Sequence, residues 1–362
     1  MPYMKIAVIV PSLRDLAPVQ VAIAVAGYLA RSGHSVTVYY FKAQFGIQQP
    51  EDIRFKKISF FERMAWRDYD IIHSHGFVPD TFVSLRKPAR CRAKTVTTVH
   101  NYVFPELKLL YNQVVSSAVG WSWVLMWKRM DHMVLLTDDA VKYYRTLLPQ
   151  KPLSRIYNGK NIVQYPGGIL PQHRLQADEI RKHYSYCIGT IAALISRKRI
   201  DILIRHLSRV ETGGLLILGE GPERNHLEEL VAKYSLQDRV KFLGFIPQAH
   251  AYHELFDISA HTSMSEGFSL SLIEAAWYQK KIACSDIPSF REAFSDDEAT
   301  FFDSDDELTI DRAIRESWQD NEKPMKAFKK AKTYYTEERM GEEYAILFKQ
   351  LSLQAKTNNP WP

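Results

Sequence analysis

The sequence contains very little cysteine. Its three cysteines, Cys91, Cys187 and Cys284, lie about a hundred residues apart in a chain of 362 residues. This spacing allows neither a Cys-x-x-Cys metal site nor a disulfide framework. We therefore expect a protein of the cytoplasm, where thiols stay reduced.

Long apolar runs are also missing. The longest weakly polar stretch, SSAVGWSWVLMW (116–127), has twelve residues, whereas a membrane-spanning helix needs about 20. The N-terminal MPYMKIAVIVPSL carries one lysine and a short apolar run, which is typical of a buried first strand rather than a signal peptide. We expect no transmembrane helix.

Glycine-rich phosphate loops are absent from the places where nucleotide-binding enzymes carry them. The sequence has no G-x-x-x-x-G-K-[ST] motif, and PSLRDLAPVQV (11–21), after the first predicted strand, has no glycine. P-loop enzymes and dinucleotide-dependent dehydrogenases are therefore disfavoured.

The length and the charge distribution indicate two different halves. A chain of 362 residues with 46% hydrophobic residues is expected to form two domains of roughly 170 residues each. Residues 1–165 contain 22 Lys/Arg and 11 Asp/Glu, a balance of +11, and residues 166–362 contain 25 and 30, a balance of -5. The two halves are expected to face different partners.

Short β-branched and aromatic runs alternate with helical stretches in two series. The predicted strands are KIAVIVP (5–11), SVTVYYF (35–41), DIIHSH (70–75), AKTVTTVH (93–100) and HMVLL (132–136), then CIGTIAAL (187–194), GLLILG (214–219), RVKFLGF (239–245), DISAHTS (257–263) and KIACSD (281–286). This alternation predicts two doubly wound parallel sheets, which bind ligands at the carboxyl ends of their strands.

The expected domain boundaries follow from these two series. We expect an N-terminal domain over 1–165, a C-terminal domain over 166–335 and a linker in QYPGGILPQ (164–172). The amphipathic stretch 333–354 predicts a closing helix, and residues 336–362 are expected to pack back on the N-terminal domain.

Two glutamates stand out in SEGFSLSLIEAA (265–276). Glu266 precedes a predicted strand-to-helix turn and Glu274 follows it by eight residues, which corresponds to roughly 12 Å of helix. This is about the distance between the sugar and the ribose of a nucleotide-sugar. The free amides of the first helical turn attract anions such as a diphosphate. A capping residue followed by an exposed helix glutamate would give the same spacing.

Two further loops are expected near this turn. LGEGPE (218–223) follows a predicted strand, and its glycines let backbone approach a ligand. ISRKRIDILI (195–204) places Arg197 and Lys198 at the carboxyl end of another strand, which favours diphosphate binding. A plain turn and a solvated basic loop are the alternatives.

These segments together resemble the family 4 glycosyltransferases of the GT-B fold. SMSEGFSLSLIEAA matches the E-x7-E motif of that family, and LILGEGPE resembles its G-x-G-P loop. Further similar segments, which extend the resemblance from residue 5 to about 350, are RVKFLGFIP, IACSDIPSFRE, RIYNGKNI, DIIHSHG and TTVHNYVF.

The resemblance implies a fold and a reaction. The fold would be GT-B, in which two Rossmann-like domains face each other across a cleft. The enzyme would move a hexose or N-acetylhexosamine from a nucleotide-sugar, with UDP-sugars favoured, to a glycan or lipid-linked saccharide. It would retain anomeric configuration and need neither a cofactor nor a metal. Surface polysaccharide or lipopolysaccharide synthesis is the implied setting.

The resemblance also implies roles for individual residues. Glu266 would bind hydroxyls of the transferred sugar, Glu274 would hold the ribose, and Lys198 would pair with the diphosphate. His100 would lie near the donor sugar and the acceptor. The other implied donor-site residues are Arg197, Gly219, Gly244, Phe245, Ile246, Gly267, Phe268, Ser269, Leu270, Ala17 and Pro18.

Two positions depart from the family pattern. Ala193 stands where the family usually has an arginine, five residues before Lys198, and Arg197 is the candidate replacement. The N-terminal Gly-Gly loop of the family is replaced by LAPVQ, which contains Ala17 and Pro18. The alternative functions are therefore a nucleotide-sugar epimerase, a glycan phosphorylase, or a weakly active scaffold subunit of a glycan-assembly complex.

The remaining motifs are interpreted as mainly structural. His73 and His75 share a strand face but no third metal ligand is suggested, and the D-x-D of DYD (68–70) is discounted because it simply precedes a strand. In WSWVLMWKR (121–129), Trp123 and Trp127 lie one helical turn apart. They would either pack inside the N-terminal domain or form an interfacial helix on an anionic membrane, at the cytoplasmic face of the inner membrane. No nucleic acid is expected as a partner.

Overall fold

The computed structural model describes residues 3–47, 49–162 and 168–357, and the chain forms two compact units. Unit 1 consists of the chain up to Gly159 together with the part from Thr336 onward, and unit 2 consists of Lys160–Tyr335. The chain thus leaves the first unit six residues before the expected boundary at 165/166. The central part of the predicted linker, residues 163–167, lies outside the described residues.

Unit 1 is built on a parallel sheet with the strand order β3-β2-β1-β4-β5-β6-β7. Its strands are β1 (Lys5–Leu13), β2 (Ser35–Phe45), β3 (Arg54–Lys57), β4 (Ile71–His75), β5 (Lys94–Val99), β6 (His132–Leu135) and β7 (Leu153–Arg155). Strand β4 is buried along its whole length and β1 almost so, because helices cover both faces of a parallel sheet. The five predicted strands of this half are present, and the short edge strands β3 and β7 were not predicted.

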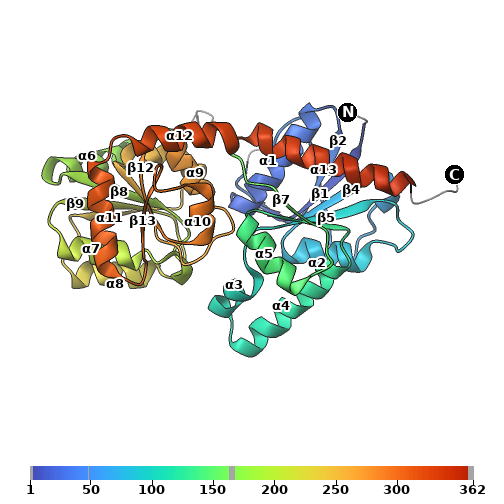
Figure 1. The fold of residues 1–362 in the computed structure, drawn as a ribbon, viewed down its shortest axis with the longest axis horizontal. Helices are drawn as coiled ribbons and strands as arrows, with labels where there is room; N and C mark the ends of the chain where they lie inside the picture. Colours follow the sequence, from blue (N-terminus) through green and yellow to red (C-terminus); the bar gives the residue numbers. More distant parts are fainter. Residues whose placement is uncertain (1–2, 48, 163–167, 358–362) are drawn as a thin grey trace. The chain divides into compact units, whose positions relative to one another are not determined.

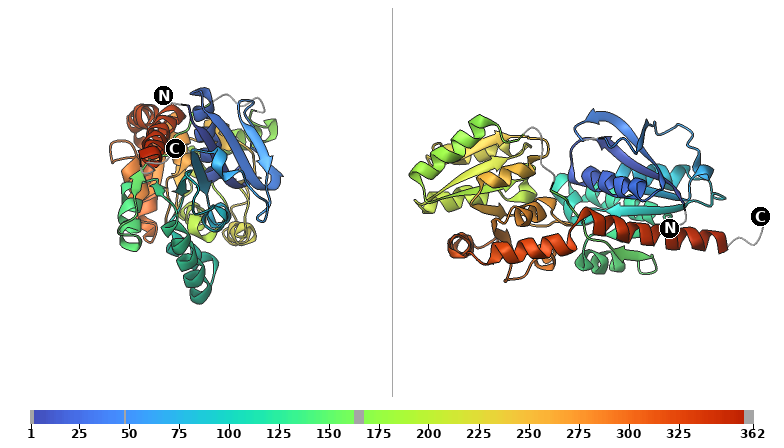
Figure 2. Two further views of the ribbon diagram at one scale, coloured as in Figure 1. Left: turned by 90° about the vertical axis from the view of Figure 1, so that its right-hand side faces the viewer. Right: turned by 90° about the horizontal axis from the view of Figure 1, so that it is seen from above.

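Helices of unit 1 surround this sheet (Figure 1). They are α1 (Ala17–Arg31), α2 (Phe77–Arg86), α3 (Val103–Leu110), α4 (Gln113–Lys128), α5 (Asp138–Leu147) and α13 (Glu337–Thr357), with a short 3-10 helix, η1 (Trp66–Asp68). The C-terminal helix α13 packs tightly on α1, since a Cβ atom at Gly341 would overlap the ring of Tyr28. Figures 1 and 2 show α3 and α4 extending together away from the sheet.

The C-terminal helix expected from residue 336 is present, since α13 starts at Glu337 and belongs to unit 1. The amphipathic stretch 333–354 begins slightly earlier, in the last turn of another helix. The chain forms α12 (Lys323–Tyr334) and α13, with a break at Tyr335 and Thr336. The hydroxyl of Tyr335 donates to the carbonyl of Ala293 at 2.8 Å, and the Thr336 side chain accepts from the first turn of α13. A Cβ atom at Gly159 would overlap the Thr336 carbonyl. Contacts with distant residues therefore end one helix and start the next.

Unit 2 contains a second parallel sheet with the order β10-β9-β8-β11-β12-β13. Its strands are β8 (Tyr186–Ile191), β9 (Gly213–Leu218), β10 (Val240–Gly244), β11 (Ile258–His261), β12 (Lys281–Ser285) and β13 (Thr300–Phe302). Its helices are α6 (Pro171–His183), α7 (Asp201–Arg209), α8 (Arg224–Lys233), α9 (Leu270–Trp277), α10 (Pro288–Ala293), α11 (Glu307–Gln319), α12, η2 (Ser196–Lys198) and η3 (Ala249–Leu255). The five predicted strands are present, and the edge strand β13 was not predicted.

Two of the three tryptophans of α4, Trp123 and Trp127, pack in or against the core of unit 1. Trp127 is fully buried, and Trp123 packs beside it with ring centroids 5.0 Å apart. Both indole N–H groups donate to Oδ2 of the buried Asp80 at 2.8 Å. An interfacial role for Trp123 and Trp127 is therefore wrong, because buried indoles need an internal acceptor and Asp80 supplies it.

Among the described residues, no helix is both long enough and apolar enough to cross a membrane.

Candidate functional site

The site of unit 2 lies where its parallel strands end. Three chain segments meet there: residues 192–198 after β8, residues 219–221 after β9, and residues 262–269 between β11 and α9. The loops are joined by backbone hydrogen bonds, with Leu194 N–H donating to Glu220 at 3.0 Å and Met264 N–H donating to Arg197 at 2.9 Å. These hydrogen bonds hold the loops against each other at the carboxyl end of the sheet.

Glu266 is the centre of a buried ion cluster on this surface. Its Oε2 accepts from Arg197 Nη1 at 3.1 Å, and its Oε1 accepts from Ser263 Oγ at 2.6 Å and from Lys198 Nζ. Arg197 also donates to the Ser265 carbonyl. Glu266 and Arg197 are each 8% exposed. Buried charges persist only when they are paired in this way.

The cluster keeps the Glu266 carboxylate ionised. Burial by itself would raise its pKa, but the Lys198 ammonium, the Arg197 guanidinium and the Ser263 hydroxyl together lower the pKa to about 2. Two cations face one carboxylate, so the cluster carries a net positive charge. An anionic group that entered the cluster would be stabilised by Lys198 and Arg197.

The geometry of the cluster is fixed by neighbours on the same sheet. The hydroxyl of Thr262 donates to the Lys198 carbonyl. The hydroxyl of Ser285, at the end of β12, donates to the carbonyls of Ser263 at 2.7 Å and His261 at 3.1 Å. Because these bonds hold the backbone that leads to Glu266, its carboxylate is preorganised.

The amino end of α9 follows the cluster directly. Gly267 and Phe268 lead into Ser269, whose side chain accepts from Leu272 N–H as the helix cap, and Leu270 starts the helix. This strand-turn-helix arrangement was predicted from the sequence. The remaining amides of the first turn have no partner within the helix, which makes this a place for an anion next to Lys198.

Glu274 lies on the buried side of α9, at 7% exposure. The alternative of an exposed helix glutamate is therefore wrong. Its Oε1 lies 3.7 Å from Nζ of Lys160. Sequence analysis missed Lys160, although it directly follows the Asn-Gly pair of RIYNGKNI, a segment already associated with the family.

The glycines of this edge are required by close backbone packing. Gly219 has φ of +135° and Gly244 has φ of +76°, and Gly219 N–H donates to the Gly244 carbonyl at 2.8 Å. A Cβ atom at Gly219 would overlap the Ala192 carbonyl. Next to this contact, Phe245 is 55% exposed and Ile246 is half-buried.

Ala193 has no side chain that could reach Glu266. Arg197, four residues later on η2, supplies the second cation of the cluster. Among the described residues, Arg197 is thus the arginine that pairs with Glu266, as its position in the sequence suggested.

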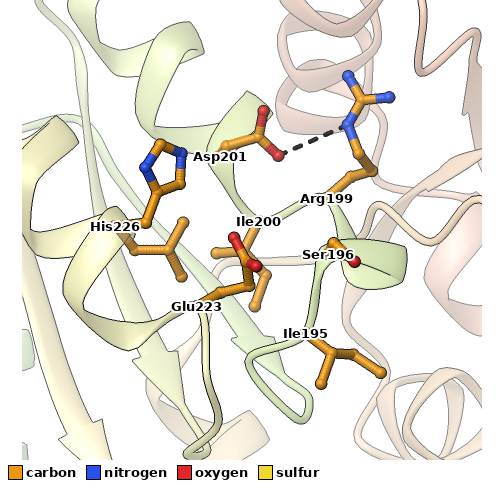
Figure 3. Close-up of a pocket in the computed structure, with 8 residues that line it drawn as sticks. Ile195, Ser196, Arg199, Ile200, Asp201, Glu223 and His226 are labelled. Carbon is orange, nitrogen blue, oxygen red and sulfur yellow. Dashed lines mark ion pairs between the residues drawn. The ribbon is translucent and has the colours of Figure 1, made fainter. Parts of the chain in front are cut away.

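A separate pocket of about 210 Å³ is lined by residues of η2 and the segments that follow it and by residues at the start of α8 (Figure 3). It is lined by Ile195, Ser196, Arg199, Ile200, Asp201, Glu223, His226 and Leu227. Arg199 forms an ion pair with Asp201, its Nε lying 3.5 Å from Oδ1. The predicted donor-site residues are not among those that line this pocket within the described structure.

The remaining predicted residues belong to unit 1. Ala17 and Pro18 open α1 after Leu16, which forms no side-chain cap, and Pro18 suits the first turn of a helix. His100 directly follows β5 and is half-buried. Its Nε2 lies 2.9 Å from Nδ1 of His75. Sequence analysis named His75 only as half of a discounted metal pair.

Comparison with known proteins agrees with this architecture. The model described as Glycosyltransferase Family 4 matches residues 19–163, and the model described as Glycosyl transferases group 1 matches residues 174–334. The O-antigen biosynthesis glycosyltransferase WclY of Escherichia coli is 31% identical over 303 residues, which cover 80% of this chain and 82% of that protein.

Solved structures share the fold. Sucrose-phosphate synthase from Thermosynechococcus elongatus superimposes with a TM-score of 0.82 at 16% identity, over 97% of this chain and 100% of that chain. Anabaena Alr3699/HepE, in complex with UDP and glucose, gives a TM-score of 0.77 at 16% identity, over 96% and 100%.

These findings define an enzyme of the glycosyltransferase class with the GT-B fold. The chain belongs to glycosyltransferase family 4, with a group 1 glycosyltransferase domain in its C-terminal half.

Proposed function

We propose that the enzyme transfers a hexose or N-acetylhexosamine from a UDP-sugar to a saccharide or lipid-linked saccharide, with retention, during synthesis of a bacterial surface polysaccharide. The observation that carries the proposal is the ion cluster of Glu266, Arg197 and Lys198 beside the amino end of α9. The similarity to WclY supports the O-antigen type of product, and the UDP complex of the HepE neighbour supports the uridine nucleotide.

The cluster could bind both the sugar and the diphosphate of a nucleotide-sugar. The Glu266 carboxylate can accept hydrogen bonds from sugar hydroxyls, and Lys198, Arg197 and the helix amides can hold a diphosphate. Glu274, in the second turn of α9, would hold the ribose. Glu266, before the helix, and Glu274, within it, would thus bind the two ends of the nucleotide-sugar.

The proposed chemistry needs no metal ion. The bond between the anomeric carbon and the diphosphate oxygen breaks, and Lys198, Arg197 and the amides stabilise the departing negative charge. The acceptor hydroxyl attacks the anomeric carbon from the face that the diphosphate leaves. Its proton passes to the leaving phosphate oxygen, so charge and atoms balance, and the anomeric configuration is retained.

A lipid-linked acceptor would bring the enzyme to a membrane, and α4 offers a surface for that contact. Val114, Ala118, Trp121 and Leu125 follow one another at spacings of four, three and four residues, and all are exposed. Residues with this spacing form one face of a helix. Val114 is 79% exposed, and Trp121 and Leu125 are 57% exposed each.

Basic residues accompany this apolar face. Lys128 closes α4 and Arg129 follows it, both exposed, and Lys108 is exposed on the neighbouring helix α3. An apolar face with lysine and arginine beside it is the composition that binds anionic lipid surfaces. We therefore assign the membrane contact to the opposite side of α4 from Trp123 and Trp127.

Vesicle sedimentation tests the membrane contact. We expect the wild type to pellet with phosphatidylglycerol vesicles and not with phosphatidylcholine vesicles, and the Trp121→Ala/Leu125→Ala double variant to lose most of this binding. Leu308→Ala is the control, because Leu308 is a similarly exposed leucine in unit 2. Equal pelleting of wild type and double variant would refute the assignment and leave the transferase proposal untouched.

A thermal-shift panel of UDP-, GDP- and ADP-sugars, without metal, tests the donor site on wild type and Glu274→Ala. We expect stabilisation by UDP-sugars that is weaker in the variant. Nuclear magnetic resonance of the product then reports its anomeric configuration, and an inverted product would exclude the proposed course of the reaction. Conversion of the donor without any acceptor would indicate an epimerase. A requirement for inorganic phosphate would indicate a phosphorylase, and the absence of stabilisation by any donor would indicate a scaffold role.

A further inference from the structure

Three histidines of unit 1 contact one another at the carboxyl end of its sheet. His73 and His75 lie on β4 with ring centroids 4.2 Å apart, and His100 follows β5 with its ring 5.2 Å from that of His75. Nδ1 of His75 lies 2.9 Å from Nε2 of His100. On its other side, His73 packs against Tyr344 and Phe348 of α13. Among the described residues, no group of three or more His, Cys, Asp or Glu side chains is arranged to hold a metal ion.

All three rings are neutral at ordinary pH. Burial lowers the pKa of His73 and of His100 to about 3, and it lowers the pKa of His75 well below its usual range. A neutral imidazole carries one N–H and one bare nitrogen. In the bond between His75 and His100, one ring must therefore donate and the other must accept.

The far nitrogen of His75 decides between the two arrangements. Its Nε2 is buried and has no hydrogen-bond partner among the described residues. If the proton were on Nε2, a buried N–H would stay unpaired, which is rarer in proteins than an unpaired acceptor. The proton of His75 is therefore on Nδ1, the atom that faces His100.

We infer that His75 is a positioning residue: its Nδ1–H donates to Nε2 of His100, which fixes the proton of His100 on Nδ1. His100 is half-buried, and no described residue forms a hydrogen bond with its Nδ1. The ring thus presents a hydrogen-bond donor. On the proposed function, on which this step rests, the Nδ1–H of His100 donates to an oxygen of the acceptor.

This assignment excludes one catalytic role for His100. A ring whose exposed nitrogen already carries a proton cannot accept the proton of the acceptor hydroxyl. The arrangement therefore agrees with proton transfer to the leaving phosphate oxygen. It also explains why an apolar strand carries a second histidine two residues after His73, on the same face.

His73 follows the same rule and supports the neighbouring strand. Its Nδ1 is buried without a partner among the described residues, and its Nε2 lies 2.8 Å from the hydroxyl of Thr98. The proton is then on Nε2 and donates to Thr98, whose hydroxyl lies 2.7 Å from that of Tyr344. His73 thus belongs to a structural chain that ends on α13, whereas His75 is bonded to His100.

Nitrogen-15 spectroscopy of histidine rings tests the tautomer directly. The full-length protein, labelled in its twelve histidines, is measured without substrate, and the His100 signals are assigned by their loss in His100→Gln. We expect a protonated Nδ1 and a bare Nε2 for His100 in the wild type. A protonated Nε2 would overturn the inference. This readout does not depend on the donor or on turnover, so a failure of the proposed function would leave it intact.

Two substitutions of His75 separate hydrogen bonding from packing. The amide of Asn can place an N–H donor where Nδ1–H stood, so His75→Asn should keep the His100 tautomer and most of the turnover. His75→Phe keeps the ring but removes the donor. It should give a mixture of His100 tautomers and lower kcat by about tenfold, the ratio that corresponds to one hydrogen bond, with little change in KM for the donor.

His132→Phe is the matched control. His132 is another buried histidine of unit 1, bonded to Ser154 and not to the cluster, so its variant should lose stability without changing the His100 signals. If His75→Asn and His75→Phe reduced kcat equally, His75 would act by packing and the inference would be wrong. If His75→Phe did not fold, the wild-type and His75→Asn spectra would still decide the tautomer.

Discussion

Two buried carboxylates, Asp80 in unit 1 and Glu266 in unit 2, lie near the ends of sheet strands and have opposite kinds of partner. In unit 1, Asp80 is fully buried and accepts four hydrogen bonds, all from neutral groups: the hydroxyls of Ser74 and Thr97 and the indoles of Trp123 and Trp127. In unit 2, Glu266 is paired with two cations, Arg197 and Lys198.

The partners determine the charge of each carboxylate. Burial raises the pKa of Asp80, and the four neutral donors only partly offset this. For Glu266 the same effect of burial is overcome by the cations, and its pKa falls to about 2. Asp80 therefore serves to fix α2, α4, β4 and β5 to each other, whereas the Glu266 cluster holds a net positive charge ready for an anionic ligand.

The largest expected effect is that of Glu266→Gln. The amide keeps the shape but leaves Arg197 and Lys198 without a buried counterion, which should destabilise the protein by about 3–5 kcal/mol. Turnover should fall by about 100- to 1000-fold, because an electrostatic partner of the reacting centre is lost. Steady-state kinetics and urea unfolding measure the two effects.

Two variants control for this result. Glu298→Gln removes a partly buried carboxylate of unit 2 that is paired with Lys330 outside the cluster, and Asp80→Asn removes the buried carboxylate of unit 1. Both should lower stability with turnover within about threefold of the wild type. If Asp80→Asn abolished turnover as Glu266→Gln does, the functional contrast between the two carboxylates would be wrong.

The next effect concerns the arginine that stands in a different position from that of the family. Arg197→Ala should raise KM for the nucleotide-sugar by about 10- to 100-fold, the loss typical of a charge-assisted hydrogen bond. Adding Ala193→Arg should recover part of this loss by supplying the guanidinium from the family position. Nucleotide-sugar titration and kinetics measure both.

Arg199→Ala is the matched control, because Arg199 lies on the same loop but pairs with Asp201 and Asp305. The KM of this variant for the nucleotide-sugar should stay within twofold of the wild-type value, because Arg199 does not pair with Glu266. If adding Ala193→Arg to Arg197→Ala did not lower KM again, an arginine at position 193 would be unable to replace the contact that Arg197 makes with Glu266.

Much of the fold could be predicted from the sequence because its central strands are continuous apolar runs. The strands that were missed are RFKK (54–57), LSR (153–155) and TFF (300–302), which are short and lie at sheet edges. Edge strands bury less surface, so their sequences carry a weaker pattern. The break at Tyr335 and Thr336 coincides with the boundary expected between residues 335 and 336, and contacts with Gly159 and Ala293 hold it.

For the candidate site, the sequence predicted residues but not their partners. Glu266, Arg197 and Lys198 were proposed from their motifs, and the structure brings the three together in one ion cluster. Lys160 beside Glu274 and His75 beside His100 were missed, because each pair joins residues that are 114 and 25 positions apart in the chain. The tryptophans of α4 were ambiguous for the same reason, since Asp80 lies more than forty residues before them.

A smaller loss of stability is expected when one of the hydrogen-bond donors to Asp80 is removed. Trp127→Phe keeps an aromatic ring in the core but removes one of two N–H groups on Oδ2, which should lower the free energy of unfolding by about 1–3 kcal/mol. Asp80→Asn/Trp127→Phe should lose less than the sum of the single changes, because the two residues share a bond. Urea unfolding of the four proteins measures this coupling, and strict additivity would show that the Trp127–Asp80 bond contributes nothing.

The smallest expected effect is the pH dependence of the stability lost in Glu266→Gln and in Asp80→Asn. It is also the sharpest test of the difference between the two carboxylates. Glu266, whose pKa is lowered from about 4.5 to about 2, contributes stability that is complete above about pH 4.5 and lost as the pH falls. Asp80, whose pKa is raised from its usual 3.8, binds its proton more tightly when folded, so its ionisation costs stability as the pH rises. Relative to wild type, the deficit of Glu266→Gln should therefore shrink from about pH 5 to 3.5 and that of Asp80→Asn should grow, each by at most about 1.4 kcal/mol per pH unit. Groups that do not interact with Glu266 or Asp80 titrate alike in all three proteins and cancel in these differences. The buried His261 interacts with Glu266, but its pKa of about 3 lies below this pH range. Urea unfolding at several pH values measures the two slopes, and slopes of the same sign would show that both carboxylates are held in the same way.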